Sequence, residues 1–162
     1  MKIGILSDTH GYLHPEIFNF FKGCDEIWHA GDILSDSMIE ELSSICKVRA
    51  VWGNCDDWGI RKQCNEIEVF DCDEHKVFLK HIIGRPANYD SETLKQIKQH
   101  KPSIVVAGHS HILQVIADKK NNWLFINPGA AGRFGPHIRL TFLIFEINGK
   151  EISNLKVWDE PK

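Results

Sequence analysis

Aspartate, asparagine and histidine residues recur in this sequence directly after short apolar runs. They occur in five segments: Asp-Thr-His (8–10), Gly-Asp (31–32), Gly-Asn-Cys-Asp (53–56), His81 and Gly-His-Ser-His (108–111). Carboxylate, amide and imidazole groups are donors that bind divalent transition-metal ions in proteins. Seven of these side chains are therefore candidate metal ligands: Asp8, His10, Asp32, Asn54, His81, His109 and His111.

The spacing and number of these donors indicate more than one ion. Asp8 and His10 are two positions apart, as are His109 and His111, and such residues point to the same side of extended backbone. Seven donors are too many for one tetrahedral ion, and they suit two ions about 3.5–4 Å apart with one bridging carboxylate. Nitrogen and oxygen donors without thiolate favour Mn, Fe, Co, Ni or Zn over Ca or Mg.

Most of these segments also have a structural explanation when each is taken alone. Asp-x-His and Gly-Asp occur in turns and helix caps, and Gly-Asn-x-Asp is a common turn composition. Gly-His-Ser-His is more specific, because two histidines in a tight loop after a buried strand have few structural uses. The complete set, with each member at the end of an apolar run, favours a metal site over turns alone.

Alternating strands and helices are expected to position the donors. Strands are predicted at residues 2–7, 26–30 and 48–52, separated by a helix starting near Pro15 and a helix capped by Ser35 or Asp36. This pattern predicts parallel neighbouring strands. The carboxyl ends of parallel strands share one edge of the sheet, where ligands bind.

The second half of the chain is expected to be richer in β-structure. We predict a helix from about Ser91 and strands at residues 66–70, 76–81, 103–107, 112–117, 123–127, 138–147 and 151–158. The first two of these strands form a hairpin around residues 71–75. We therefore expect one domain over residues 1–162, of the α/β class, with two facing mixed β-sheets flanked by helices.

Composition narrows the range of partners and compartments. The net charge is -3 and no basic block is present, so duplex nucleic acid is not an expected partner. The apolar runs are too short to span a membrane, and the N-terminus lacks a secretory signal pattern, so we expect a cytoplasmic protein. The five cysteines include no Cys-x-x-Cys pair, which favours free thiols over disulfides or structural zinc.

The five donor segments together resemble the calcineurin-like metallophosphoesterase superfamily. The short chain and the Asn-Pro-Gly at 127–129 resemble its compact phosphodiesterase branch, which includes the retromer subunit of eukaryotic vacuolar sorting. The resemblance implies a four-layer sandwich of two sheets and outer helices. It also implies a first metal held by Asp8, His10 and His111, a second held by Asn54, His81 and His109, and Asp32 as the bridge.

The activity implied by the resemblance is hydrolysis of a small soluble phosphate ester, with a phosphodiester as the expected class. The attacking group would be hydroxide from a water that bridges two ions. Manganese is the first expectation for the ions, with Ni, Co, Fe or Zn as alternatives. A phosphomonoesterase and a non-catalytic protein-binding scaffold are the alternative functions, and a homo-oligomer is left open.

Cys55 departs from the superfamily pattern. Many members carry at this position a histidine that contacts phosphate and can protonate the leaving oxygen. We therefore expect Cys55 to be a small residue facing the substrate, and Asp56 to support the loop. His29 is expected in the core and His75 in solvent, whereas Arg133 and His137 are expected to have a structural or interface role, with phosphate contact as the alternative.

Overall fold

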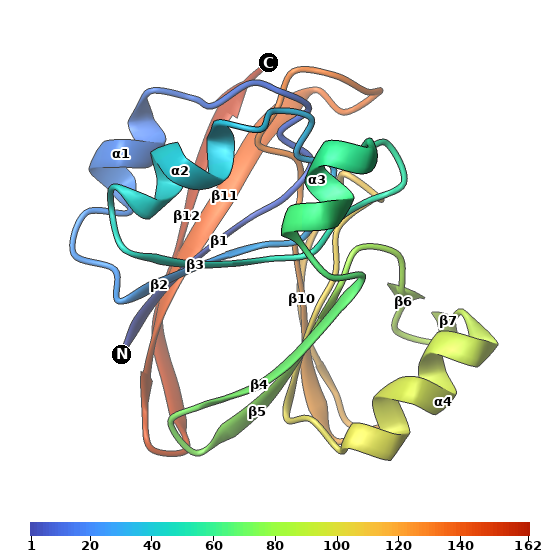
Figure 1. The fold of residues 1–162 in the computed structure, drawn as a ribbon. Coiled ribbons are helices and arrows are strands. Elements are labelled where there is room, and N and C mark those ends of the chain that lie inside the picture. The colour runs from blue at the N-terminus through green and yellow to red at the C-terminus, as the bar shows by residue number, and fades with distance from the viewer.

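Two five-stranded mixed β-sheets face each other in the computed structural model, which describes residues 1–162 (Figure 1). The strand order in the first sheet is β12-β11-β1-β2-β3. Its strands are β1 (Lys2–Leu6), β2 (Glu26–His29), β3 (Lys47–Ala50), β11 (Arg139–Asn148) and β12 (Glu151–Pro161). Strands β1, β2 and β3 are parallel, whereas β11 is antiparallel to both β1 and β12.

The second sheet has the order β4-β5-β8-β10-β9. Its strands are β4 (Ile67–Cys72), β5 (His75–Lys80), β8 (Ile104–Val106), β9 (Leu113–Asp118) and β10 (Trp123–Pro128). Strands β5, β8 and β10 are parallel, and β4 and β9 form the antiparallel edges. A separate short hairpin joins β6 (Gly84–Arg85) and β7 (Asn88–Tyr89).

Four helices complete the fold: α1 (Glu16–Phe20), α2 (Met38–Ser43), α3 (Trp58–Gln63) and α4 (Ser91–His100). Helices α1 and α2 cover the outer face of the first sheet, and α4 lies against the outer face of the second (Figure 1). None of these helices has both the length and the apolar character needed to cross a membrane. The predicted fold class, with two facing mixed sheets flanked by helices, is confirmed.

Successive side chains of β1 alternate between the second sheet on one face and helix α1 on the other. Ile3 and Ile5 face the second sheet and pack in the cluster between the sheets, whereas Leu6 packs with Phe21 on the α1 side. A Cβ on Gly4 would lie 2.9 Å from the Phe21 ring, so this glycine lets the end of α1 approach the strand closely. Because both faces of β1 are buried, a one-residue shift would turn Ile3 and Ile5 toward the helices, where Phe21 leaves no room for a side chain at the position of Gly4. The position of the strand end, where the donors begin, is therefore set by the core.

The structure corrects two local expectations and adds one helix that was not predicted. Helix α2 begins after Ser37 without a side-chain cap, because the Ser37 hydroxyl donates to Glu41 Oε1 at 2.8 Å instead. Helix α3 was not expected, since its six residues bury only Ile60, although Asp57 caps it by accepting the backbone N–H groups of its first turn. His75 is buried, not solvated, because β5 already begins at this residue and its Nδ1 lies 2.9 Å from Ser103 Oγ.

Candidate metal centre

Loops from both sheets meet at one end of the sandwich. The loops after β1, β2 and β3 come from the first sheet, and those after β5 and β8 come from the second. The backbone N–H of Asp8 donates to Gly31 O at 2.9 Å, which joins the first two loops. The backbone N–H of His109 donates to Asp8 Oδ2 at 3.0 Å, which ties the β8 loop of the second sheet to them. The five donor segments thus share one site.

Asp8 and Asp32 are held in the same manner. Each carboxylate accepts a backbone N–H on one oxygen: Asp8 Oδ2 from His109, and Asp32 Oδ1 from Cys55 at 2.8 Å. The other oxygen of each faces histidine nitrogens. Asp8 Oδ1 lies 3.1 Å from His111 Nε2 and 4.0 Å from His81 Nε2. Asp32 Oδ2 lies 3.3 Å from His81 Nε2 and 3.8 Å from His10 Nε2. Both free oxygens therefore lie between two imidazoles.

The hydrogen bond at the far side of the His81 ring fixes its tautomer. Its Nδ1 lies 2.6 Å from the carbonyl oxygen of Ala30, which can only accept, so Nδ1 carries the proton. In the neutral ring, Nε2 then presents a lone pair to Asp32 and Asp8. A lone pair facing carboxylate oxygens is repulsive unless a cation or a proton lies between them.

A chain of two histidines imposes the same tautomer on His111. His137 Nε2 lies 2.9 Å from the carbonyl oxygen of Gly132, so this nitrogen donates and Nδ1 of the neutral ring accepts. His111 Nδ1, at 2.9 Å from His137 Nδ1, must then donate. His111 Nε2 is left with its lone pair toward Asp8. His137 therefore has the structural role expected of it, and Arg133 packs over the Tyr12 ring at 4.9 Å.

Replacing His137 by Leu should lower the affinity for divalent metal by about 10–100-fold, the usual cost of losing the outer partner of a metal-binding histidine. The variant removes the acceptor for His111 Nδ1–H and frees the ring to rotate or change tautomer. His137→Gln should restore part of the affinity, because its amide can accept from His111 and donate to Gly132. Calorimetric titration with Mn²⁺ measures both. Equal affinities for the wild type and His137→Leu would show that this contact does not position His111.

Unpartnered buried atoms converge on the same space. The structure has four buried side-chain nitrogen or oxygen atoms without a hydrogen-bond partner, and three belong to this site: Asp8 Oδ1, His10 Nε2 and His81 Nε2. Such atoms are rare in proteins because each costs free energy, so they call for a ligand or a functional reason. Donor atoms within 4.8 Å of one another form three overlapping groups: Asp8–His10–His111, Asp8–Asp32–His81 and His10–Asp32–Cys55. The residues present therefore fit divalent ions.

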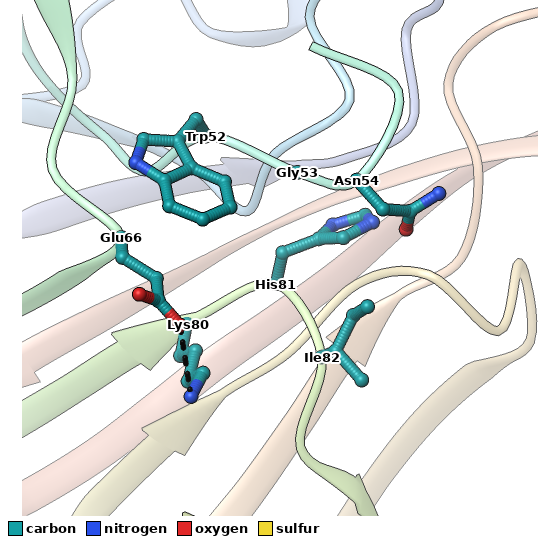
Figure 2. Close-up of a pocket in the computed structure, with 7 residues that line it drawn as sticks. All are labelled: Trp52, Gly53, Asn54, Glu66, Lys80, His81 and Ile82. Carbon is teal, nitrogen blue, oxygen red and sulfur yellow. Dashed lines mark ion pairs between the residues drawn. The ribbon is translucent and has the colours of Figure 1, made fainter. Parts of the chain in front are cut away.

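Asn54 and His109 lie at the exposed mouth of the cluster. The His109 ring centroid is 5.3 Å from that of His81. Asn54 lies beside His81 in a small hollow (Figure 2). Its amide nitrogen is 3.3 Å from Cys55 Sγ. His109 does not belong to the compact donor groups, which are formed by histidine, cysteine and carboxylate side chains. Five of the seven expected donors therefore lie in the compact groups, together with Cys55. The other two expected donors, Asn54 and His109, lie at the rim.

Backbone strain is concentrated at the candidate ligands. Five of the seven have positive φ angles between 47° and 66°: Asp8, His10, Asp32, His109 and His111. Residues other than glycine rarely adopt this left-handed region, which costs roughly 1–3 kcal/mol each. Backbone hydrogen bonds hold the strained turns; the N–H of His10, for example, donates to Asp32 O at 2.9 Å. Strain repeated at the residues that carry the donors supports a functional reason for the geometry.

Burial and charge keep Asp32 and His10 in metal-binding protonation states. Burial raises the pKa of Asp32, but the His81 ring and the Cys55 N–H outweigh it and hold this pKa well below its usual range. Burial lowers the pKa of His10 by more than Asp32 and Asp8 raise it. Asp32 is therefore ionised and His10 neutral near pH 7. Without a bound cation, burial and the Asp32 carboxylate raise the pKa of the Cys55 thiol to about 11, which argues against a free thiolate nucleophile.

Buried groups behind the donors support the site, and sequence reasoning found only some of them. Asp56 accepts the N–H groups of Ile33, Leu34 and Gly53 at 2.7–2.8 Å, which confirms its expected support of the loop. Asn127, at the start of the Asn-Pro-Gly segment, donates from Nδ2 to Gly108 O at 2.7 Å and so braces the His-Ser-His loop. This contact joins residues 19 positions apart, so no local sequence pattern indicates it.

His29 is a fully buried histidine beneath the site, as expected. Its Nδ1 accepts the N–H of Gly31 at 3.2 Å, so its Nε2 carries the proton and donates to Thr9 Oγ1 at 3.0 Å. Both ring nitrogens are thereby satisfied in the neutral form. Burial lowers the pKa of His29 to about 3.

The unfolding free energy of the metal-free protein should fall as pH is lowered from about 6.5 toward 3, partly through His29. The unfolded chain protonates this histidine near pH 6.5 and the folded protein does not, so acid favours unfolding by up to about 1.4 kcal/mol per pH unit in this window. His29→Gln removes the group, and urea titrations in chelator at pH 6.5 and 5.5 should show a smaller pH dependence for the variant. If the unfolding free energies of the wild type and of His29→Gln fell equally between the two pH values, the buried neutral state of His29 would be contradicted.

Two hollows open beside the donor cluster. One, of about 60 Å³, lies against Trp52, Asn54 and Ile82, with the Lys80–Glu66 ion pair (3.2 Å) along its wall (Figure 2). The other, of about 210 Å³, lies beside His109. Its lining includes the polar side chains of Arg85 and Asn88 and two apolar ones, Ile83 and Ile112. These hollows leave open space on two sides of the cluster.

A two-sheet α/β sandwich with carboxylates and imidazoles gathered at the strand ends defines the class of metal-dependent phosphoesterase-like proteins. Residues 1–150 match the calcineurin-like phosphoesterase superfamily domain, and a phosphodiesterase of Methanocaldococcus jannaschii is 30% identical over 148 residues, covering 80% of this chain and 83% of the relative. The chain therefore belongs to the calcineurin-like phosphoesterase superfamily, which confirms the family expected from its motifs.

Further relatives agree with this assignment. A probable metallophosphoesterase of Methanothermobacter thermautotrophicus is 28% identical over 137 residues, covering 80% of this chain and 77% of the relative. The fold is also that of Vps29 from Entamoeba histolytica in complex with Zn²⁺, with a TM-score of 0.75, 21% identity and 99% of each chain covered.

Proposed function

We propose that this protein is a dinuclear-metal phosphodiesterase that hydrolyses a small soluble phosphate ester. The observation that carries the proposal is the buried space in which histidine lone pairs and carboxylate oxygens face one another without hydrogen-bond partners. Membership of the phosphoesterase superfamily supports the reaction class, and the relative named a phosphodiesterase supports the diester.

The proposed ligands divide between two ions. Asp8, His10 and His111 would hold the first ion, and they form one of the compact donor groups. His81 would hold the second, with Asn54 and His109 closing over it from the rim. Asp32 would be shared, since its Oδ2 lies near both His81 and His10. Mixed nitrogen and oxygen donors suit divalent transition metals, and manganese is the first ion to test.

When bound, two divalent ions supply acidity to water and positive charge to the phosphoryl transition state. The protein would position those ions through carboxylates that are themselves held in place. The backbone N–H groups of His109 and Cys55 fix one oxygen of each carboxylate, so the other points inward. The hollows beside Trp52 and Arg85 would receive the two ester arms. Position 55 holds a cysteine and not a histidine that could protonate the leaving oxygen. We therefore expect a preference for esters with good leaving groups.

We also propose that residues 1–162 form a single metallophosphoesterase domain. The superfamily match spans residues 1–150. The remaining residues lie almost entirely in β12, which pairs with β11 from Asn148–Glu151 to Arg139–Pro161. This strand is an edge of the first sheet, so removing it would uncover the backbone of β11.

The test is hydrolysis of an activated aryl phosphodiester by the Mn²⁺-loaded protein, with the matching monoester assayed in parallel. We expect turnover of the diester that depends on the metal and exceeds turnover of the monoester. The reverse preference would indicate a phosphomonoesterase. A protein that binds two ions but hydrolyses no member of a broad panel of mono- and diesters would contradict the proposal and favour a protein-binding scaffold.

A further inference from the structure

Cys55 is the one cysteine that the fold places among metal-binding donors. Its Sγ, a nitrogen of His10 and a carboxylate oxygen of Asp32 all lie within 4.8 Å of one another. The chain has four other free cysteines, of which Cys24, Cys64 and Cys72 are buried and Cys46 is half-buried, and none belongs to a donor group. The position of Cys55 is fixed by its own backbone, because its N–H donates to Asp32 Oδ1 at 2.8 Å.

The partners of Cys55 in this group are buried and available. His10 has a side chain that is 6% exposed, and its Nε2 has no hydrogen-bond partner. The Asp32 side chain is 3% exposed, and its Oδ2 lies 3.8 Å from that nitrogen. The unpartnered nitrogen of His10 and the carboxylate of Asp32 thus both lie near the sulfur. Cys55 itself is exposed, so an ion can reach the group from solvent.

The neighbouring asparagine contacts the sulfur through its side-chain amide. Asn54 Nδ2 lies 3.3 Å from Cys55 Sγ and donates to it, so the sulfur is the acceptor. A thiolate accepts such a bond more strongly than a neutral thiol, because the acceptor is charged. This contact also turns the amide nitrogen of Asn54, a group that cannot bind a metal, toward Cys55.

We propose that Cys55 Sγ is a ligand of the ion bound by His10 and Asp32. The proposal rests on the dinuclear metal centre proposed above, and it replaces the purely substrate-facing role expected from the sequence. Binding exchanges the thiol proton for the ion and releases that proton to solvent, so no oxidant or reductant is needed. The other donors to this ion are nitrogen and oxygen atoms. A thiolate among them selects softer ions, so the site should favour Zn²⁺ and Co²⁺ over Mn²⁺ more than an all-nitrogen-and-oxygen site would.

Titration of the full chain with Co²⁺, followed by absorption spectroscopy, tests the proposal. The wild type should develop a near-ultraviolet thiolate-to-cobalt charge-transfer band together with the visible bands of bound Co²⁺. Cys55→Ser should lose the charge-transfer band and keep visible bands, while Cys46→Ser, a matched control, should keep both. In competition experiments, the preference of Cys55→Ser for Zn²⁺ over Mn²⁺ should fall by at least about tenfold, the lower end of what loss of an outer-shell partner costs.

The outcomes separate this proposal from the proposed function. Two Co²⁺ ions bound by the wild type without a charge-transfer band would overturn the ligand role of Cys55 and leave the dinuclear centre standing. A band that persists in Cys55→Ser would also overturn it, because another cysteine would then be the ligand. A wild-type protein that binds no Co²⁺ at all would overturn both.

Discussion

Asp32→Asn should reduce phosphodiester hydrolysis by more than about 100-fold and weaken binding of both metal ions. Loss of an outer-shell partner already costs about 10–100-fold, and Asp32 is the carboxylate placed nearest to both His81 and His10. The amide that replaces it has no charge and only one oxygen. That oxygen can keep the Cys55 N–H bond or face the ions, but it cannot do both.

The measurement is the initial rate at saturating Mn²⁺, together with the Mn²⁺ affinity. Asp36→Asn is a matched control, because Asp36 is an exposed aspartate four residues away in the same loop. It should behave like the wild type in both assays. An Asp32→Asn variant that retained both the rate and the affinity for two ions would show that Asp32 is not a shared ligand.

Gly53→Ala should damage both the metal centre and the stability of the fold. A Cβ at this position would lie 2.1 Å from Asp32 Oδ1 and 2.5 Å from Asp32 N, so a backbone atom as well as the carboxylate would have to move. Overpacking of this kind costs about 1–3 kcal/mol. Any movement of Asp32 also breaks its bond with the Cys55 N–H. We expect the unfolding free energy to fall by about that amount and Mn²⁺ affinity to fall by more than about tenfold.

Gly59→Ala provides the comparison for this substitution. Its Cβ would approach the carboxylate oxygens of Asp36 and Asp57 at 3.0 and 3.2 Å, and at least the exposed Asp36 side chain is free to move. Gly59 lies in α3, where alanine is favoured over glycine by up to about 1 kcal/mol. Urea unfolding and Mn²⁺ titration should show little loss for this variant. If Gly53→Ala were equally benign in both measurements, close packing against Asp32 would not be a requirement of the site.

The strand ends and the donor residues could be predicted from the sequence because both follow from short-range patterns. Apolar runs of four to six residues marked β1, β2 and β5, and the polar residues after them marked the loops. The edge at which these loops meet follows from parallel pairing. Helix α3 and the β6–β7 hairpin have too few buried residues to leave a periodic signal.

The environment of the donors could not be predicted from the sequence, because it depends on distant contacts. The tautomer of His111 is set by His137, which is 26 positions away, and the tautomer of His81 by Ala30, which is 51 positions away. The left-handed conformation of His10 and His111 likewise depends on the surrounding loops, since residues other than glycine adopt it in only a few per cent of cases. Cys55 was expected to face only the substrate because the seven donors were enough for two ions. The structure sets Asn54 and His109 at the rim and the thiol beside His10 and Asp32.

The measurement that tests the central claim most directly is an X-ray structure of the Mn²⁺-loaded protein with anomalous scattering at the manganese edge. We predict two anomalous peaks about 3.5–4 Å apart, both within coordination distance of Asp32. One peak should lie near His10 and His111, and the other near His81 and His109. A single peak at this site, or two peaks that do not share Asp32, would contradict the dinuclear centre.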